Sequence, residues 1–225
     1  MSVFYQGDIK THLPRIPSES VHLIYIDPPF GTTRQPWDEK LDWEWIFAQF
    51  FRVLRKDGTL VIHCSVPFSY ELIRAAPKPP LYSWYWNKKQ TTCPLIANVQ
   101  PLRCVEEILV WKREKTTYYR QQEGTEPRKS KWMTKTAYYG QNVQEKETVL
   151  LGKTRTHLIE MLRSHDGFST RPKEIVKLII DSYTKPGDTI LDCFCYKGLS
   201  STQARDRRWI GIDKYFFPTL FVESR

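Results

Sequence analysis

The chain alternates apolar runs of strand length with segments whose apolar residues recur at helical spacing. The runs are rich in β-branched residues and are bounded by turn-forming residues, as buried strands are. We therefore expect strands at residues 21–26, 59–64, 82–87, 105–112, 188–192 and 208–213. Strands that alternate with helices predict an α/β protein with a mostly parallel sheet. No helical pattern separates the third run from the fourth, so these two predict an antiparallel pair.

Helices are expected where an apolar stripe lies between capping residues. Asp42 is a good N-cap for the stripe that follows it, and Gly58 is placed to end that helix in a left-handed conformation. Pro172 fits the first position of a second helix, which the sequence Lys-Pro-Gly ends at residues 185–187. Shorter helices are expected over residues 69–76 and from about Leu199.

Composition and charge narrow the classes of protein. A length of 225 residues suits one domain, or one domain with an inserted lobe. The net charge of +9 and the pI near 9.3 favour a polyanionic partner, usually nucleic acid. No apolar run reaches about 18 residues, and no signal-peptide pattern opens the chain, so we expect an intracellular, cytoplasmic protein. Five cysteines without a Cys-x-x-Cys pair predict reduced thiols and no metal site.

The middle of the chain differs from its two flanks. Residues 113–167 have weak periodicity and many basic and aromatic residues, which predicts an inserted, basic, loop-rich lobe. We expect residues 1–112 and 168–225 to form the two parts of the α/β domain. The lobe is a candidate surface for DNA, although a solvated loop with a few docked aromatics is the alternative. The candidate DNA-binding residues are Arg120, Arg128, Lys129 and Lys131.

The sequence Asp27-Pro28-Pro29-Phe30 ends the first predicted strand. The prolines stop the strand because neither can donate a ladder hydrogen bond. Ligands bind at this end of the strands in open α/β sheets. The carboxylate and a carbonyl could hold an exocyclic amine while the ring stacks on the attached base. A plain turn with Phe30 in the core is the alternative, and His63 is a possible proton acceptor, although a lone histidine is more often structural.

A second candidate site follows the fifth predicted strand. Asp192 ends that strand, a loop with Gly198 leads into a helix, and Asp213 ends the next strand. An acid at this last position can accept hydrogen bonds from the two hydroxyls of a ribose. The loop is neither Gly-x-Gly-x-x-Gly nor a P-loop, which favours a ligand of adenosine and an amino acid, such as S-adenosylmethionine. The alternative is that both acids cap strand ends.

Taken together, the two sites resemble the circularly permuted (beta-type) DNA amino-methyltransferases, and the phage- and prophage-like adenine-N6 enzymes among them. The resemblance rests on Asp-Pro-Pro-Phe followed later by Asp-x-Phe-x-x-x-Gly, and on the segments Gly7-Asp8 and Ser169-Thr170-Arg171-Pro172. It implies a Rossmann-like fold, S-adenosylmethionine as methyl donor, and the flipped adenine of double-stranded DNA as acceptor. The cofactor-binding residues it implies are Asp8, Ile9, Thr170, Asp192, Phe194, Gly198 and Asp213.

The chain departs from that family at three positions. Tyr196 replaces a glycine of the cofactor loop, Val105-Glu106 stands where His-Glu is common, and Arg171 stands where lysine is more frequent. The alternatives are a cytosine-N4 DNA methyltransferase, an RNA adenine methyltransferase, and a nucleic-acid-binding homologue without activity. Asp27, rather than serine, favours adenine. The resemblance also implies a homodimer and a restriction-modification context, in a bacterial, phage or viral host.

Overall fold

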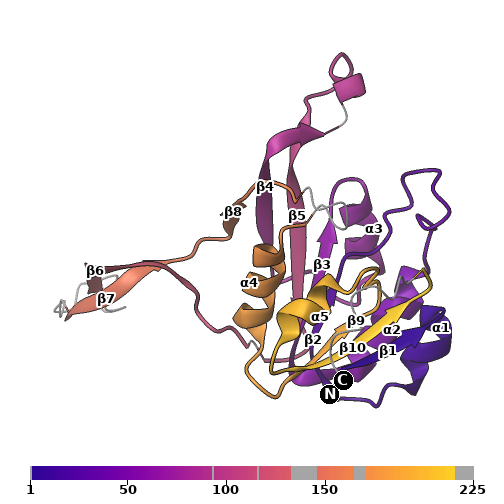
Figure 1. Ribbon diagram of the computed structural model, residues 1–225, viewed down its shortest axis with the longest axis horizontal. Helices are drawn as coiled ribbons and strands as arrows, with labels where there is room; N and C mark the ends of the chain where they lie inside the picture. The colour runs from indigo at the N-terminus through magenta and orange to yellow at the C-terminus, as the bar shows by residue number, and fades with distance from the viewer. Residues whose placement is uncertain (1, 93, 116, 133–145, 165–170, 216–225) are drawn as a thin grey trace. The chain divides into compact units, whose positions relative to one another are not determined.

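A computed structural model describes residues 2–92, 94–115, 117–132, 146–164 and 171–215 (Figure 1). The chain divides into two units, Met1–Tyr119 with His157–Arg225, and Arg120–Thr156. The first unit is built on an eight-stranded sheet in the order β1-β10-β9-β2-β3-β5-β4-β8. Its strands are β1 (Val3–Gln6), β2 (Val21–Ile26), β3 (Leu54–Cys64), β4 (Tyr82–Thr92), β5 (Arg103–Lys112), β8 (Leu158–Glu160), β9 (Thr189–Asp192) and β10 (Arg208–Asp213).

The sheet is mostly parallel, as predicted. Strands β1, β10, β9, β2 and β3 pair in parallel, whereas β5 runs antiparallel to both β3 and β4. The predicted antiparallel pair is therefore confirmed, and the three-residue strand β8 adds to its outer side in parallel with β4. The strand order reverses direction between β9 and β2, and ligands bind at such a point in open α/β sheets.

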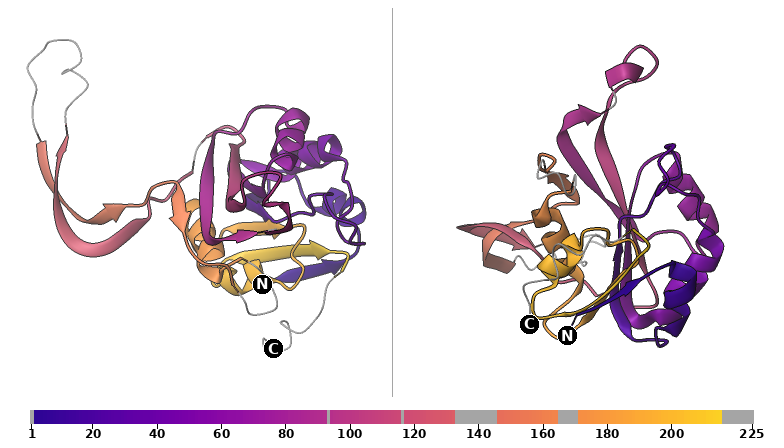
Figure 2. Two further views of the ribbon diagram at one scale, coloured as in Figure 1. Left: turned by 90° about the horizontal axis from the view of Figure 1, so that it is seen from above. Right: turned by 45° about the vertical axis from the view of Figure 1, so that its right-hand side comes forward.

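Helices cover both faces of the sheet (Figures 1 and 2). Because successive side chains of a strand point to opposite faces, Ile24 and Ile26 of β2 pack with the first helical layer, and Leu23 and Tyr25 pack with the second. Both faces of β2 are thus buried, which explains its nearly continuous apolar sequence. The first layer contains α1 (Ile9–His12), the 3-10 turn η1 (Leu13–Arg15), α2 (Trp43–Val53) and α3 (Phe68–Ala75); the second contains α4 (Lys173–Tyr183) and α5 (Leu199–Ala204).

Two predicted helix boundaries need correction. The side chain of Asp42 caps α2 as predicted, accepting from the Trp45 N–H at 3.1 Å, but the helix ends at Val53 and β3 begins at once. Gly58 therefore lies inside β3, where a Cβ would come within 2.8 Å of the Leu54 side chain. It serves close packing rather than a left-handed turn. Pro172 is the N-cap of α4, one position before the place predicted.

The second unit, Arg120–Thr156, contains strands where loops were expected. Strand β6 (Gln122–Trp132) pairs antiparallel with β7 (Lys146–Thr154), from Gln122 opposite Thr154 to Trp132 opposite Lys146. β6 is polar, β7 has only the short apolar run 149–151, and neither strand alternates apolar and polar residues, so the sequence carries little signal for them. The exact division of the chain at residues 112 and 168 stays a prediction.

Two features, a long apolar helix and a cluster of metal-ligating side chains, are absent from the described ranges. No helix in these ranges is long and apolar enough to span a bilayer. Nor do their His, Cys, Asp and Glu side chains form a group of three or more that is arranged to hold a metal ion.

Candidate active site

A cavity of about 710 Å³ lies at the carboxyl ends of β2, β9 and β10. This volume is typical of sites for small molecules and cofactors. The structure brings together most of the site residues predicted from both halves of the chain. The predicted residues that line the cavity are Asp8, Ile9, Asp27, Pro28, Pro29, Phe30, Asp192, Phe194 and Asp213.

The turn after β2 is held by a carboxylate to which the sequence analysis gave no role. Asp38 is buried and accepts backbone N–H groups from Gly31 at 2.7 Å, Thr32 at 2.9 Å and Thr33 at 2.5 Å. Burial acts to raise the pKa of Asp38, but these hydrogen bonds outweigh burial and lower it. The loop that follows Phe30 is therefore fixed around a charged carboxylate at one wall of the cavity.

Phe30 combines the two roles considered for it. Its ring stacks on that of Phe68, with 4.8 Å between centroids and 20° between planes, and it packs against the core under α2. It also lines the cavity, beside Pro29. The core thus holds the ring in place, and a planar ligand in the cavity can contact it.

On the opposite wall, Asp192 ends β9 and is almost fully buried. Its carboxylate accepts the Ser200 hydroxyl and, at 3.1 Å, the backbone N–H of Phe194. Burial raises the pKa of Asp192 to about 7, although both hydrogen bonds favour its charged form. The sequence analysis placed this acid at the start of the cofactor loop, and the structure shows that it also anchors α5 through Ser200.

Asp213 ends β10 and shapes the same wall. Its carboxylate accepts backbone N–H groups from Tyr196 at 2.5 Å and Tyr215 at 2.6 Å. Burial raises the pKa of Asp213, and these two hydrogen bonds oppose that rise. A carboxylate oxygen can accept two hydrogen bonds, so Asp213 can still accept from a ligand hydroxyl.

The loop between Asp192 and α5 keeps the backbone that a glycine would favour. Tyr196 has a φ of 42°, in the left-handed region, and its side chain is 44% exposed at the cavity wall. Gly198 also has a positive φ, 73°, and is the N-cap of α5. Among the described residues that line the cavity are its neighbours Lys197 and Leu199, but not Gly198 itself. Its role in cofactor binding stays a prediction.

The segment after β1 also lines the cavity. The Gly7 N–H donates to the Asp213 carbonyl at 2.9 Å, and the Asp8 side chain caps α1 by accepting from the Lys10 N–H at 2.8 Å. Asp8 and Ile9 line the cavity, as the resemblance implied. Thr170 lies outside the described residues. Arg120, Arg128, Lys129 and Lys131 belong to the second unit, where the side chains of the last three are outside the described part.

A set of charged and polar side chains surrounds Asp27, and we call it the Arg171 cluster. Arg171 pairs with the Asp27 carboxylate through Nη1, with Glu106 Oε1 through Nη2 at 2.7 Å, and with His63 Nδ1 through Nε at 3.0 Å. His63 Nε2 lies 3.0 Å from the Tyr25 hydroxyl, and Lys88 Nζ lies 3.1 Å from Glu106 Oε2. The members of the cluster are Tyr25, Asp27, His63, Lys88, Glu106 and Arg171.

The electrostatics of the Arg171 cluster favour a charged Glu106 beside a neutral His63. Burial acts to raise the pKa of Glu106, but Arg171, His63 and Lys88 outweigh burial and hold it well below its usual range. Burial lowers the pKa of His63, and the Arg171 charge lowers it further. Burial also raises the pKa of Asp27, against the opposing charge of Arg171. The Asp27 side chain is 31% exposed and is the member of this ion-pair network most open to the cavity.

Sequence reasoning did not identify this cluster as a unit. Arg171 and Glu106 were noticed as departures from a family pattern, and His63 was judged more often structural. One signal was available, because Tyr25 and His63 are polar residues inside otherwise apolar buried strands. Buried polar side chains need partners, so their positions predict that some exist but not which ones.

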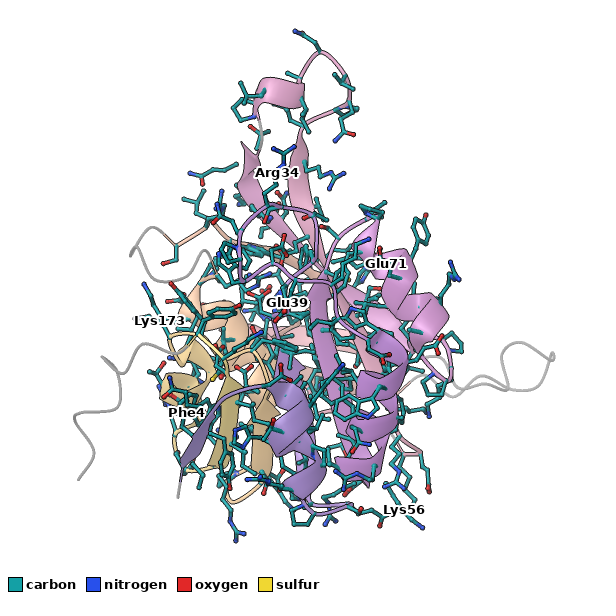
Figure 3. The ribbon with its side chains drawn as sticks, turned by 90° about the vertical axis from the view of Figure 1, so that its right-hand side faces the viewer. Phe4, Arg34, Glu39, Lys56, Glu71 and Lys173 are labelled. Carbon is teal, nitrogen blue, oxygen red and sulfur yellow. The ribbon has the colours of Figure 1, made fainter. Side chains whose placement is uncertain are left out.

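Two contacts join opposite sides of the cavity mouth. Lys214 Nζ lies 3.1 Å from Glu39 Oε1, and the Tyr215 hydroxyl donates to the Pro36 carbonyl at 3.1 Å. Figure 3 shows Glu39 and Arg34 of this loop on the side away from Lys56, which lies near the amino end of β3. The loop after Phe30 is thus tied to the residues that follow β10.

Comparisons with known proteins agree with this geometry. Residues 21–216 match the N6/N4 methyltransferase family model, described as DNA methylase. DNA adenine methyltransferase YhdJ of Escherichia coli (strain K12) is 38% identical over 65 residues, which cover 25% of this chain and 22% of that protein. Type II methyltransferase M.XycI of Xanthomonas campestris pv. cyanopsidis is 24% identical over 266 residues, covering 94% of this chain and 83% of that protein.

Solved structures share the fold. The crystal structure of the M1.HpyAVI-SAM complex has a TM-score of 0.60 at 20% identity, covering 96% of this chain and 95% of that one. The cytosine-N4-specific PvuII DNA methyltransferase has a TM-score of 0.67 at 16% identity, covering 96% of this chain and 82% of that one. The family match spans most of the chain, including both walls of the cavity. The chain therefore belongs to the N6/N4 DNA methylase family.

Proposed function

We propose that this protein transfers a methyl group from S-adenosylmethionine to the N6 amine of adenine in double-stranded DNA. One observation carries the proposal: Asp27-Pro28-Pro29-Phe30 and the acids Asp192 and Asp213 line a single cavity. A group that holds an amine and a group that holds a methyl donor must face each other for direct transfer. The order of the two motifs along the chain also supports the permuted, phage-like class of these enzymes.

The wall formed by β9 and β10 fits the proposed cofactor. Asp213 keeps acceptor capacity for ribose hydroxyls, and Phe194 offers an apolar surface for an adenine ring. Asp192 and Asp8 place acids near a ligand that is positively charged at sulfur and at its amino group. The M1.HpyAVI structure, titled as a SAM complex, supports this ligand for the shared fold. Its sulfonium supplies a reactive methyl group when bound.

The wall formed by the β2 turn fits the acceptor. The adenine amine is a poor nucleophile because its lone pair is delocalised into the ring. Asp27 and the Pro28 carbonyl would accept its two N–H groups and turn the lone pair toward the methyl donor. Phe30 would stack on the base, which must leave the duplex to reach the cavity. Most of the rate acceleration would come from alignment and placed charge.

The choice of adenine rests on two observations. Asp27 stands at the start of the motif, where serine would favour cytosine, and YhdJ is named as an adenine methyltransferase. Cytosine-N4 methylation is the second candidate, because the PvuII enzyme, titled as cytosine-N4-specific, shares the fold. Methyl transfer from labelled S-adenosylmethionine to duplexes that hold only adenine or only cytosine as acceptor separates these two activities. An RNA substrate in the same assay tests the alternative of an RNA adenine methyltransferase.

The first test is the substitution Asp27→Ala. We expect methyl transfer to fall by at least about 100-fold, because the amine loses its charged acceptor. Binding of S-adenosylmethionine, measured by calorimetry, should stay close to wild type. The same substitution at Asp57, an acid near the amino end of β3, is the control and should leave both values unchanged. Wild-type turnover in Asp27→Ala would refute the assigned role.

No binding of S-adenosylmethionine by the wild type at millimolar concentration would favour the inactive, nucleic-acid-binding alternative.

For the second unit we propose contact with DNA through Arg120, Arg128, Lys129 and Lys131. Charge reversal at the last three should weaken DNA binding and flatten its salt dependence, by about one unit of slope for each lost phosphate contact. Reversal at the exposed residues Lys10, Lys56 and Lys185 gives the same net charge and serves as the control. An unchanged salt slope would remove this unit from the interface.

A homodimer and a cognate nuclease are further proposals. Sedimentation of the protein with and without DNA tests the homodimer.

A further inference from the structure

Arg171 holds the carboxylate on which the proposed reaction depends. Its guanidinium contacts three side chains through three different nitrogens: Asp27 through Nη1, Glu106 through Nη2, and His63 through Nε. The arginine side chain is 11% exposed, the glutamate 7% and the histidine 0%. Asp27 contacts the guanidinium through Oδ2, and its side chain is 31% exposed at the cavity. The planar guanidinium thus holds the Asp27 carboxylate through one oxygen, while the side chain stays partly exposed at the cavity.

The Arg171 cluster also explains how the guanidinium itself is held. Glu106 on β5 accepts from Arg171 and pairs on its other oxygen with Lys88 of β4. His63 on β3 lies against Arg171 and Glu106 through Nδ1, and its Nε2 contacts Tyr25 of β2. Strands β2, β3, β4 and β5 thus fix a residue that precedes α4. Arg171 must itself be held in one position if it is to orient Asp27.

The charge on Asp27 depends on the balance of its neighbours. Burial and the negative charge of Glu106 raise the pKa of Asp27, whereas Arg171, His63 and Lys88 lower it. Arg171 is the largest of the lowering influences. Asp192, on β9, lines the same cavity; burial raises its pKa most, and the charges of Asp213 and Asp27 add to that rise. A protonated Asp27 would donate a hydrogen bond instead of accepting one, and it could no longer draw the amine of a base toward tetrahedral geometry.

We infer that Arg171 is a positioning residue for methyl transfer: it orients Asp27 through one oxygen and keeps that carboxylate charged, so that the other oxygen accepts the target amine. This inference rests on the proposed function. It also assigns Glu106 as the residue that holds Arg171 in place. A purely structural Arg171, which tied α4 to the sheet and nothing more, would affect folding but not the protonation of Asp27.

Three substitutions separate these roles. Arg171→Met removes the charge and keeps the length of the side chain. Arg171→Lys keeps the charge and loses the planar fork. Glu106→Gln keeps Arg171 but removes a negative charge near Asp27. For each variant and the wild type, the measurements are thermal unfolding, the affinity for S-adenosylmethionine, and kcat for a DNA duplex from pH 5 to pH 9.

For Arg171→Met we expect kcat to fall about 100-fold at neutral pH, with S-adenosylmethionine affinity within about threefold of wild type. The midpoint of the loss of kcat at low pH should move upward by about one to three units, because Asp27 loses its opposing charge. Arg171→Lys keeps the positive charge, so its midpoint should stay close to that of the wild type. Glu106→Gln should move the midpoint in the opposite direction, toward lower pH, because a like charge has gone.

The opposite shifts decide the question. If Arg171→Met folds, binds cofactor and keeps the wild-type pH profile, the inference is wrong. If Arg171→Met does not fold, Glu106→Gln still decides: a midpoint in Glu106→Gln equal to that of the wild type would refute the inference. Absence of methyl transfer by the wild-type protein would instead refute the proposed function, and cofactor binding and unfolding would show that the protein tested was intact.

Discussion

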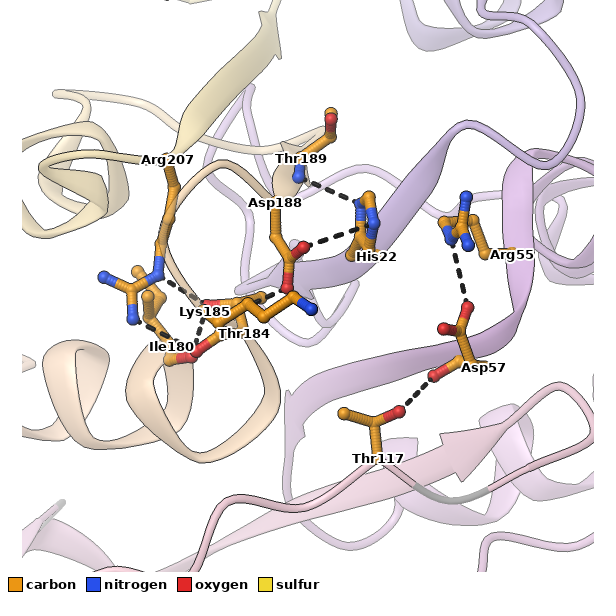
Figure 4. Close-up of polar contacts among 10 residues, drawn as sticks. All are labelled: His22, Arg55, Asp57, Thr117, Ile180, Thr184, Lys185, Asp188, Thr189 and Arg207. Atoms are coloured by element: carbon orange, nitrogen blue, oxygen red, sulfur yellow. Dashed lines mark hydrogen bonds and ion pairs between the residues drawn. The ribbon is translucent and has the colours of Figure 1, made fainter.

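Two groups of charged side chains lie at opposite ends of the same sheet, and they differ in what surrounds them. The Arg171 cluster lies at the carboxyl ends of β2 and β3 and borders the cavity through Tyr25, Asp27, Glu106 and Arg171. The second group, which we call the amino-end group, lies where β2, β9 and β10 begin (Figure 4). It consists of His22, Asp181, Thr184, Asp188 and Arg207.

In the amino-end group, charges and hydrogen-bond donors meet partners within the fold. Arg207 donates from Nε to the Thr184 hydroxyl at 2.7 Å, and from Nη2 to Asp181 at 2.8 Å and to the Thr184 carbonyl at 3.1 Å. Thr184 is the C-cap of α4, so the arginine satisfies the end of a helix. His22 accepts the Thr189 N–H at 3.0 Å and lies 3.3 Å from Asp188.

The contrast separates stability from function. None of these amino-end residues is among the described residues that line the cavity. The bonds there join the beginnings of β2 and β9, or tie Arg207, just before β10, to the last turn of α4, so their loss should weaken folding. The acids at the cavity are buried, and their charged forms cost free energy of desolvation in the folded state. Removal of charge should therefore have opposite effects on stability at the two ends of the sheet.

The largest effect is expected at Asp192, where burial raises the pKa to about 7. Unfolded aspartate releases its proton near pH 4, so between about pH 4 and pH 7 the folded state holds the proton more tightly. Stability must then fall as pH rises through this range, by up to about 4 kcal/mol. Asp192→Asn should remove this pH dependence and be inactive. Urea unfolding at pH 5 and pH 8 measures the change in the free energy of unfolding between the two pH values. An equal change in the variant and the wild type would contradict the prediction.

The next effect is expected at Arg207, in the amino-end group. Arg207→Met removes three hydrogen bonds and leaves Asp181 and the end of α4 without their partner. We expect the free energy of unfolding to fall by about 2–3 kcal/mol. Methyl transfer per folded molecule should not change, because the site is at the other end of the sheet. Thermal unfolding and an activity assay well below the transition check both halves, and a loss of kcat with unchanged stability would reverse the contrast.

The smallest effect is expected at Tyr196, which has a left-handed backbone at the cavity wall. Tyr196→Gly should stabilise the protein by about 1 kcal/mol, because glycine has no Cβ to clash in this conformation. It should also tighten the binding of S-adenosylmethionine slightly, since the ring no longer borders the cavity. Tyr196→Ala is the matched control, because it removes the ring but keeps the Cβ. If both variants gain the same stability, the backbone is not the cause.

The sequence predicted the parts of the fold that follow from local pattern. Long apolar runs located β2, β9 and β10, and their last residues located Asp27, Asp192 and Asp213 at one edge. The short elements β1, α1 and β8 show no clear period and were missed. β9 has only four residues, but the Lys-Pro-Gly sequence before it and the loop and helix after it marked its place.

The Arg171 cluster was out of reach for a different reason. Arg171 lies 108 positions from His63 and 65 from Glu106, so no local spacing connects them. Their meeting depends on the pairing of β3 with β5, which is a property of the whole sheet. Strand ends can be read from one segment, but a buried ion-pair network requires the topology first.

The reversed direction of β5 has a consequence for how this site can vary. Parallel strands contribute side chains to the site from their last residues, but Glu106 is near the beginning of β5 and Lys88 is in the later part of β4. The register places Trp86 opposite Glu106, so the two strands reach the site immediately before and after the hairpin that joins them. Residues can be inserted or lost at the tip of that hairpin without moving Glu106. The outer hairpin is thus free to diverge among related proteins while the acid behind Arg171 stays in place.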